Sequence, residues 1–377
     1  MGYSKFDDIQ IEGIVTVIPE NRLDIDDEVG YYENELHFRR NKEILGLGTR
    51  YAVDDKTSIT DLCEYAAQEL MKELKIDKNE IDAVIFASAS HDYHAPASAC
   101  IIHGRLDLKE DCSCFDIAGV SCSGYVYALW VAHSLITSGA VRNCLLLAGD
   151  INSKHTNIQN RNTCILYSDA GSATFITQKK GASRSYFYLG SKGKDWDKIV
   201  APSTGLKLAV RADISDLEIK DSQGNITHLW EDILSGIDVF KFAMDYAPQN
   251  IQKLLQYSNL KIDDIDFFPM HQANKQIMSM IAKHSGIPKN KYSSETFTKY
   301  ANSGISAITT NICDNIEYAR KSRNMLVSFG VGLSWGNAVV DLQCTKILGI
   351  KTYKSRDDAL TRRETIEYWV NRIKNGV

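Results

Sequence analysis

Apolar residues along the chain occur either in short continuous runs or at helical spacing. In the first part of the chain, the short runs predict β-strands over residues 9–19, 83–88, 114–117, 144–148 and 170–176. Apolar residues spaced i, i+3, i+4 predict an amphipathic helix over 58–74, and another helix is predicted over 123–137. Strands that alternate with helices in this way are typical of layered α/β folds.

A second series of the same kind follows a more irregular stretch at about 182–222. The same patterns predict helices within 231–257 and over 274–284 and 302–319, and strands over 265–269, 325–329 and 335–344.

The two series resemble each other. The segment LKIDKNEIDAVIF at 74–86 is similar to LKIDDIDFF at 260–268, and each closes a predicted helix and opens a strand. Further along, SCSG at 121–124 corresponds to ANSG at 301–304, each at a predicted helix start. Agreement in order and element type indicates an internal duplication.

The spacing within each series supports this interpretation. Cys122 precedes Gly149 by 27 positions and Asn302 precedes Gly330 by 28, which is room for one helix and one strand in each case. Related halves often share a site at their junction, so we expect the helix starts at Cys122 and Asn302 to face each other. We predict an N-terminal half at 1–180, a connecting region at 181–225, a C-terminal half at 226–345 and a helical extension at 346–377.

The composition excludes several classes of protein. The 377 residues are 44% hydrophobic, which disfavours disorder, and they contain no run of about 18 apolar residues that predicts a membrane span. The formal net charge of −5 argues against nucleic acid as a partner. Because no secretory signal is evident and the nine cysteines are irregularly spaced, we expect reduced thiols, a cytoplasmic location and no metal site.

Three residues at corners of the predicted sheets carry candidate chemistry. Cys122 follows a buried strand and precedes a helix, and a helix start favours the thiolate and is expected to lower the pKa of the thiol. His271 follows the strand at 265–269, and loops at the ends of strands are where α/β sheets place ligands. Asn302 precedes a helix, where it can also serve as a cap. Together they form a candidate Cys-His-Asn site.

Four motifs give the chain a resemblance to a known family. They are SCSGY around Cys122, HQAN beginning at His271, NSG beginning at Asn302, and FGxGxxWG beginning at Phe329. In this order, and over about residues 9–344, they resemble the β-ketoacyl-acyl carrier protein synthase III family of condensing enzymes. The resemblance implies a thiolase-like fold, with two duplicated α/β halves in a five-layered αβαβα core, and a homodimer.

The resemblance also implies a reaction. Cys122 would be acylated by a thioester primer, delivered as acyl-coenzyme A or acyl-acyl carrier protein. A malonyl thioester would then lose carbon dioxide and attack the acyl group, while His271 and Asn302 donate hydrogen bonds to its thioester oxygen. The oxyanion and malonyl pocket would be formed by Phe329, Gly330, Val331 and Gly332, and no cofactor beyond these thioester substrates is expected.

Some positions depart from the family pattern. Val331 replaces a glycine of the usual Phe-Gly-Gly-Gly loop. Arg161 resembles a phosphate or adenine contact, but Gln276, with Lys275 beside it, stands where the family has a basic residue. We therefore expect altered coenzyme A binding and a greater role for a carrier protein. Ala95 replaces a bulky residue of a loop that in the family reaches the partner subunit, which predicts a larger acyl pocket.

Three alternatives remain open at this point. A Cys-His-Asn order also occurs in papain-like hydrolases, although the duplicated α/β pattern argues against that class. A relative with the same fold can transfer the acyl group to an oxygen or nitrogen acceptor without decarboxylation. A non-catalytic scaffold of this fold would normally have lost Cys122. For the extension, the apolar residues Ile366, Trp369, Val370 and Ile373 predict an amphipathic helix that packs on its own body.

Overall fold

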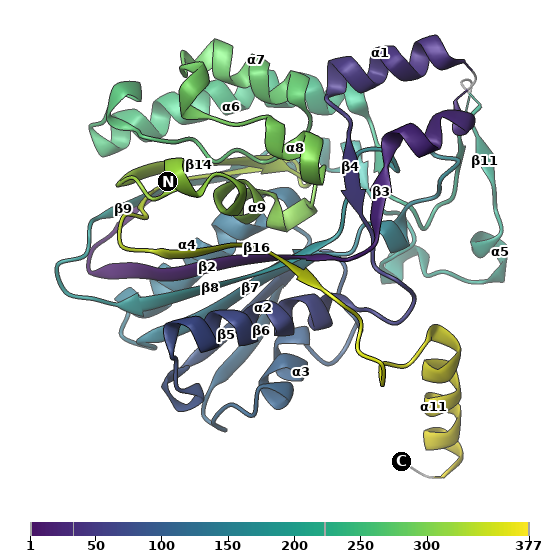
Figure 1. Ribbon diagram of the computed structural model, residues 1–377, viewed down its shortest axis with the longest axis horizontal. Helices are drawn as coiled ribbons and strands as arrows, with labels where there is room; N and C mark the ends of the chain where they lie inside the picture. The colour runs from purple at the N-terminus through teal and green to yellow at the C-terminus, as the bar shows by residue number, and fades with distance from the viewer. Residues whose placement is uncertain (1, 33, 222–223, 376–377) are drawn as a thin grey trace.

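Two β-sheets with helices on both faces form the body of the protein (Figure 1). The structure is a computed structural model that describes residues 2–32, 34–221 and 224–375. The first sheet has the order β16 (Lys346–Tyr353), β2 (Ile9–Pro19), β8 (Ala170–Gln178), β7 (Asn143–Asp150), β5 (Ala83–Ser88) and β6 (Ser113–Ala118). The second has the order β1 (Tyr3–Phe6), β9 (Ser185–Ser191), β15 (Ser334–Asp341) and β14 (Arg323–Gly330).

The main helices lie in three layers separated by the two sheets. The outer layer on the first sheet contains α2 (Ile59–Leu74) and α3 (Ser98–Arg105), the central layer contains α4 (Gly124–Thr137) and α9 (Ala307–Asp314), and the outer layer on the second sheet contains α6 (Gly236–Ser258) and α7 (Lys275–Ser285). A separate hydrophobic cluster fills each helical layer. The predicted five-layered αβαβα core is therefore confirmed.

The remaining elements are short or peripheral. The other helices are α1 (Glu35–Leu45), α5 (Ala212–Ser215), α8 (Glu295–Tyr300), α10 (Ile316–Ala319) and α11 (Arg362–Lys374). Small ribbons pair β3 (Arg22–Asp24) with β4 (Thr49–Tyr51), β10 (Ile199–Val200) with β13 (Ile233–Leu234), and β11 (Ile219–Lys220) with β12 (Ile226–Thr227). Within the ranges that the structure describes, no helix is long and apolar enough to cross a membrane.

The order of strands repeats between the sheets. Leaving β16 aside, the neighbouring strands of the first sheet follow the order β2, β8, β7 and β5. The strand that comes first in the sequence, β2, therefore lies beside the strand that comes last, β8. The second sheet runs from β9 through its last strand, β15, to β14, and the segment around Phe267 and Met270 follows through single bridges to Asn324 and Val327. This repeated order agrees with the duplication that the sequence indicates.

The structure differs from the predicted elements at three places. Residues 265–269 form a single bridge, at Phe267, in place of a strand, because Pro269 has no N–H to donate to a ladder. The predicted helix at 302–319 is divided at Asn315, whose side chain donates to the carbonyl oxygen of Asn311 and to the hydroxyl of Thr296. The connecting region at 181–225 contains β9, which lies between β1 and β15 in the second sheet, so it is not irregular throughout.

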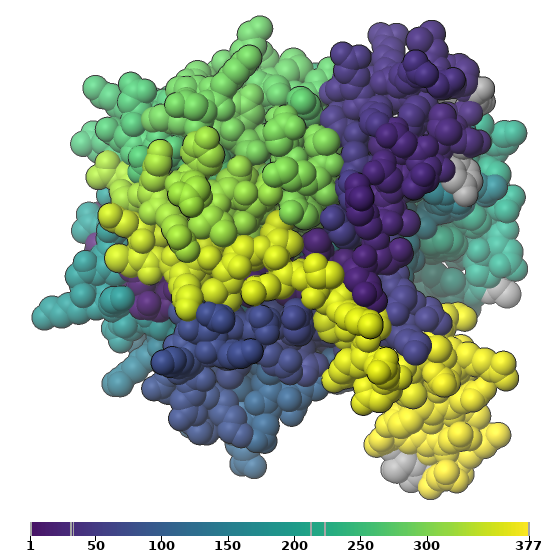
Figure 2. Space-filling view, in the orientation of Figure 1, coloured from purple at the N-terminus to yellow at the C-terminus, as the bar shows by residue number. Residues whose placement is uncertain are grey.

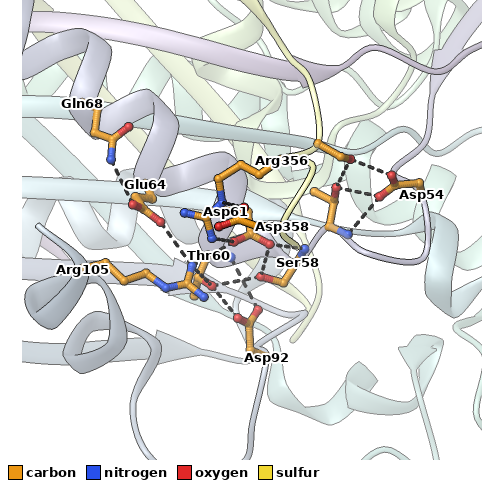
Figure 3. Close-up of polar contacts among 12 residues, drawn as sticks. Asp54, Ser58, Thr60, Asp61, Glu64, Gln68, Asp92, Arg105, Arg356 and Asp358 are labelled. Carbon is orange, nitrogen blue, oxygen red and sulfur yellow. Dashed lines mark hydrogen bonds and ion pairs between the residues drawn. The ribbon is translucent and has the colours of Figure 1, made fainter. Parts of the chain in front are cut away.

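The C-terminal extension begins with a strand and only then becomes helical, contrary to a helical extension from residue 346. β16 adds to the first sheet in parallel with β2. The chain that follows is tied to the body by polar side chains (Figure 3): Ser355 donates to Asp54 (2.6 Å), and Arg356 lies 4.0 Å from Asp61. Asp61 also accepts from Arg105 (2.9 Å).

The helix α11 is present as predicted but does not pack on its own body. It projects from the molecule at the lower right of Figures 1 and 2, and it has no buried residue. Trp369 makes an edge contact with Tyr93, at 6.1 Å between ring centroids, and Ile366, Val370 and Ile373 are exposed. The prediction of self-packing is wrong because the chain leaves the body after Arg356 in a direction that places few of its own residues near this helix.

Candidate active site

Cys122 lies at a sharp corner between a strand and a helix. The chain leaves β6 and turns at Gly119, whose φ of +74° suits a residue without Cβ. It then forms a single 3₁₀ turn, η3 (Ser121–Ser123), before α4 begins. The Cys122 side chain is buried, with 9% of its surface exposed. The sulfur is therefore placed at a helix start in the central layer, between the two sheets.

The glycine loop of the C-terminal half lies against this cysteine. A Cβ atom on Gly330, at the end of β14, would be 2.5 Å from Cβ and 3.0 Å from Sγ of Cys122. Next to it, the hydroxyls of Ser123 and Ser334 are 2.6 Å apart, and the Ser334 hydroxyl donates to the carbonyl oxygen of Val331 (2.6 Å). The loop from Phe329 to Gly332 is thus held directly on the Cys122 corner.

The Asn302 corner meets the Cys122 corner through Asp150 at the end of β7. The Asp150 carboxylate accepts from the backbone N–H of Ile305 (2.8 Å), within the 3₁₀ turn η9 (Gly304–Ser306), and from the Ser121 hydroxyl (3.3 Å). Asn302 itself accepts from the N–H of Gly304 through Oδ1 (3.0 Å). The two equivalent helix starts therefore face each other, as the duplication predicts.

His271 lies behind the same glycine loop. Its backbone N–H donates to the carbonyl oxygen of Val327 in β14 (2.8 Å), and its ring meets the Phe329 ring edge-on, at 5.7 Å between centroids. Nδ1 is buried and has no hydrogen-bond partner among the described residues. Burial lowers the pKa of His271 to about 4, so the imidazole is neutral near pH 7. In this state one ring nitrogen carries a proton that can be donated to a substrate oxygen.

The pKa of the Cys122 thiol departs from the expectation for a helix start. Burial raises this pKa to about 12, and the negative charges of Asp150 and Asp232 raise it further. The expected lowering is wrong because desolvation of the thiolate outweighs the favourable position at the start of α4. In the free protein the sulfur is therefore a thiol at neutral pH, and its proton must leave during the reaction.

Alkylation of Cys122 tests this pKa. Only the thiolate reacts with iodoacetamide, so the rate is expected to rise about tenfold per pH unit from pH 6 to 9 without a plateau. Replacing Asp150→Asn removes a negative charge that raises the thiol pKa, and it should speed alkylation at pH 8 about two- to tenfold. Mass spectrometry of the Cys122 peptide measures both rates, with Asp55→Asn on the surface as control. A plateau near pH 7 would contradict this assignment.

The predicted substrate-binding residues do not join the Cys122 corner. Arg161 donates from Nε to the Asn225 side chain (3.2 Å), in the segment between β7 and β8. Lys275 starts α7 and pairs with Glu295 (3.3 Å), and Gln276 beside it is exposed. Ala95 is exposed on the loop between β5 and α3. These four residues therefore lie on segments other than those that hold Cys122, at exposed or partly exposed positions.

Sequence reasoning missed three residues near the nucleophile. Asp150 ends a buried strand beside Cys122, and the rule that pointed to His271 at a strand's end also applies to it. Tyr167 and Asp232 lie in irregular segments, and no periodicity or motif marks them, although the charge of Asp232 raises the pKa of both Cys122 and Tyr167. Within the described part of the chain, no group of three His, Cys, Asp or Glu side chains is arranged to hold a metal ion.

Comparison with known proteins points to one family. The family model of 3-oxoacyl-(acyl-carrier-protein) synthase III matches residues 115–193, and the model of its C-terminal domain matches 255–342. A Campylobacter jejuni protein provisionally named 3-oxoacyl-(acyl-carrier-protein) synthase 3 is 34% identical over 342 residues, covering 90% of this chain and 96% of that protein. A Fusobacterium nucleatum β-ketoacyl-(acyl-carrier-protein) synthase III is 30% identical over 336 residues, covering 88% and 98%.

A solved structure supports the same relationship. The 3-oxoacyl-(acyl-carrier protein) synthase from Burkholderia xenovorans superposes with a TM-score of 0.85 at 27% identity, covering 93% of this chain and 99% of that one. The two matched segments of the family models contain Cys122 in the first and His271, Asn302 and Phe329 in the second. The papain-like alternative is thereby removed, because the chain shares its fold and its matched segments with these synthases.

Proposed function

Because this chain belongs to the 3-oxoacyl-(acyl-carrier-protein) synthase III family of condensing enzymes, we propose that it joins an acyl group on Cys122 to a malonyl thioester with loss of carbon dioxide. One observation carries the assignment of roles. The Cys122 corner, the Asn302 corner and the loop next to His271 converge through Asp150 and Gly330. The residues proposed as nucleophile and as hydrogen-bond donors thus lie on three separate segments, with His271 reaching the glycine loop through its contact with Phe329.

The first half-reaction transfers the primer to Cys122. Sγ attacks the carbonyl carbon of an acyl thioester, the bond to the donor's sulfur breaks, and the proton of the Cys122 thiol goes to that leaving thiolate. Because burial raises the pKa of Cys122 to about 12, the transfer of this proton is part of the reaction and not a step completed beforehand. Exchange of one thioester for another is nearly balanced in energy, so the site needs orientation more than driving force.

The second half-reaction uses His271 and Asn302. The malonyl carboxylate leaves as carbon dioxide, and the electron pair of the broken carbon–carbon bond passes into the thioester as an enolate. The neutral imidazole of His271 and the amide of Asn302 donate hydrogen bonds to the enolate oxygen as its charge develops. The enolate carbon then attacks the acyl carbonyl, and Cys122 leaves as a thiolate that takes up one proton from the solvent. Loss of carbon dioxide supplies the carbanion, so no strong base is required.

The glycine loop supports both steps. Backbone N–H groups at Cys122 and in the loop from Phe329 to Gly332 would hold the acyl oxyanion, since this loop lies against the sulfur. The Phe329 ring, edge-on to His271, would crowd the malonyl carboxylate and favour its loss. The branched Val331 does not block these roles, because the donors are backbone groups.

Thioesters of coenzyme A and of acyl carrier protein are the proposed substrates, and no separate cofactor is required. The side chain of Lys275 pairs with Glu295, and Gln276 is exposed and uncharged, so they offer little positive charge for the phosphates of coenzyme A. Arg161 would supply the remaining basic contact from the segment between β7 and β8. Because so little positive charge is available for the phosphates of coenzyme A, a carrier protein is favoured as the donor of the acyl group.

A two-substrate assay tests the condensation. Incubation with an acyl thioester and a malonyl thioester should yield a 3-oxoacyl thioester two carbons longer than the primer, together with carbon dioxide. Replacing Cys122→Ala removes the group that holds the primer, so product should fall at least about 10³-fold. Replacing the exposed Cys100→Ala is the control and should leave the rate unchanged. Acyl transfer to an alcohol or amine without release of carbon dioxide would favour the alternative reaction.

A homodimer is part of the proposal. β6 is the last strand of the first sheet and none of its residues is buried, which leaves a free edge that a second copy can pair with. His91 contacts Asp116 of β6 (3.2 Å), and Tyr93, two residues on, contacts Trp369 of α11. Residues 91–93 thus contact both the edge strand and α11. A cytoplasmic location is proposed with it, since all nine cysteines are free thiols.

Removing apolar side chains from α11 tests the dimer. The exposed fraction is 41% for Trp369 and 70% for Ile373, and contact with a partner would bury both. The double substitution Trp369→Ala and Ile373→Ala is expected to weaken the dimer about tenfold or more. Size-exclusion chromatography with light scattering over a dilution series measures this, with the exposed Arg372→Ala as control. A full-length chain that stays monomeric at about 100 μM would refute this part of the proposal.

A further inference from the structure

The Asp150 carboxylate, at the end of β7, joins three segments of the chain. Its side chain is fully buried. Oδ2 accepts from the Ser121 hydroxyl (3.3 Å) and from the backbone N–H of Ile305 (2.8 Å). Oδ1 accepts from the backbone N–H of Ala89 (2.7 Å) and from the Ser88 hydroxyl (3.3 Å), where the chain leaves β5. One carboxylate therefore holds the Cys122 corner, the Asn302 corner and the start of the loop after β5.

On the side of the nucleophile, Asp150 reaches the sulfur through a single hydroxyl. The Ser121 hydroxyl that donates to Asp150 lies 3.9 Å from Sγ of Cys122. Because the proton of this hydroxyl is directed at the carboxylate, its oxygen remains available to accept from the thiol. The orientation of the Cys122 S–H group thus depends on the acceptor that Asp150 offers to Ser121.

On the side of Asn302, Asp150 fixes the turn that orients the amide. While the N–H of Ile305 donates to Asp150, the N–H of Gly304 donates to Oδ1 of Asn302 (3.0 Å). This second bond occupies the amide oxygen, so the Nδ2 group is the one that can donate to a substrate. Gly304 has a φ of +58° and packs so closely on Asp150 that a Cβ atom would overlap Oδ2. The seating of η9 on the carboxylate therefore determines where the Asn302 amide points.

The surroundings of Asp150 favour its ionised form. A carboxylate only accepts hydrogen bonds, whereas the two backbone N–H groups that reach Asp150 can only donate them. Hydrogen bonds to a charged acceptor are also stronger than bonds between neutral groups. Protonation would turn one oxygen into a donor, reverse the bond from Ser121 or Ser88, and weaken the bonds from the two N–H groups.

We propose that Asp150 is a positioning residue for both half-reactions, because one carboxylate sets the places of Cys122 and Asn302 relative to each other. This inference rests on the proposed condensation. Asp150 touches no substrate and acts through Ser121 and through η9. The loop after β5, which carries Ala95 and would line the primer pocket, starts from the same carboxylate.

A pH dependence distinguishes this role from a purely structural one. Burial raises the pKa of Asp150 to about 6, although its hydrogen bonds act in the opposite direction. The ionised form therefore prevails at pH 7 to 8 and is lost as the pH falls through about 6. The charge of Asp150 acts on four titratable groups: Cys122 in η3, Cys63 in α2, Tyr167 before β8 and His91 after β5. Burial raises the pKa of the two thiols and of the phenol, so these three stay neutral near pH 6.

Two rate profiles in the native protein provide the test. Acyl-acyl carrier proteins from acetyl to octanoyl are mixed with the full-length protein, and intact-protein mass spectrometry follows the adduct on Cys122 with the fastest of them. Release of carbon dioxide from malonyl-acyl carrier protein is measured separately, and circular dichroism shows that the protein is folded at each pH. Both rates are expected to be about tenfold lower at pH 5 than at pH 7, with a shared midpoint near pH 6.

Replacing Asp150→Asn should remove this pH dependence. The amide keeps the shape of the carboxyl but turns an NH2 group towards a donor, so both rates at pH 7 should fall about 10²-fold and the decrease near pH 6 should disappear. Asp82→Asn is the matched control, because that carboxylate accepts from the backbone N–H groups of Arg142 (2.9 Å) and Asn143 (3.0 Å) at the opposite end of β7. It should leave the pH at which the rates decrease unchanged.

A second variant separates Asp150 from its neighbour His91. The His91 ring lies 3.2 Å from the carboxylate of Asp116, whose hydrogen bond raises the pKa of the imidazole. His91→Gln removes this titration, and both rates should still decrease near pH 6.

The outcomes separate this inference from the proposed function. Native rates that stay equal from pH 7 to pH 5 would overturn the inference while leaving the condensation intact. A decrease that persists in Asp150→Asn, or one that is lost in His91→Gln, would assign the titration to another group and also overturn it. Absence of any adduct on Cys122 at every pH would overturn the proposed function and this inference with it. If Asp150→Asn does not fold, the profiles of the native protein and of His91→Gln decide alone.

Discussion

Replacing His271→Ala is expected to separate the two half-reactions. The neutral imidazole donates only to the malonyl thioester, so release of carbon dioxide from malonyl thioester should fall about 10²- to 10³-fold while acylation of Cys122 stays within a few-fold. Rapid-quench measurement of the acyl adduct and a separate assay of carbon dioxide release give the two rates. The variant has to be shown folded by circular dichroism, because His271 is buried beside Phe329.

The pH dependence of the malonyl step gives a second readout for His271. Because burial lowers its pKa to about 4, the imidazole keeps the same neutral form from pH 9 down to about pH 5. As the pH is lowered, the rate of decarboxylation should therefore show no decrease around pH 6.5 that is caused by His271. His37→Ala, which removes an exposed imidazole on α1, is the matched control. Equal loss of acylation and decarboxylation in His271→Ala would contradict the assigned role.

Replacing Gly330→Ala should impair both half-reactions. The added methyl group would lie 2.5 Å from Cβ and 3.0 Å from Sγ of Cys122, closer than real contacts allow, so either the nucleophile or the glycine loop has to move. Displacement of a reacting atom by about 1 Å can cost about 10²-fold, and we expect a loss of this size in the acylation rate.

Gly104→Ala provides the control for this substitution. A Cβ atom there, on α3, meets nothing within 4 Å, so the variant should match the native protein in rate and unfold at no lower temperature. Stopped-flow or rapid-quench acylation of Cys122 compares the three proteins. A Gly330→Ala variant that acylates within about threefold of the native rate would show that the loop does not constrain the sulfur as the structure indicates.

Much of the fold could be predicted because its signals are local. The buried runs at 144–148 and 170–176 and the repeated helix starts at Cys122 and Asn302 require only short stretches of sequence. β9 was missed because it lies in a segment read as a connection, although its aromatic run from Tyr186 to Tyr188 is favourable in strands. The strand predicted at 265–269 is not formed, because the apolar pattern takes no account of the missing N–H of Pro269.

The same distinction between local and long-range signals applies to the candidate site. Cys122, His271 and Asn302 could be placed at equivalent corners because strand ends and helix starts are visible in the sequence. The pKa of Cys122 could not be predicted, since it depends on burial and on charges from Asp150 and Asp232, which are 28 and 110 positions away in the chain. The open position of α11 was likewise invisible, because periodicity shows that a helix has an apolar side and does not show what covers it.

Sequential mass measurement on one sample tests the central claim most directly. The native protein is first incubated with an acyl thioester and then with a malonyl thioester labelled in its free carboxylate. The account predicts a mass increase equal to the acyl group, located on the Cys122 peptide. It further predicts loss of that adduct on addition of the malonyl thioester, with one labelled carbon dioxide released for each adduct consumed. An acyl group on another residue, or an adduct on Cys122 that disappears without release of carbon dioxide, would contradict the account.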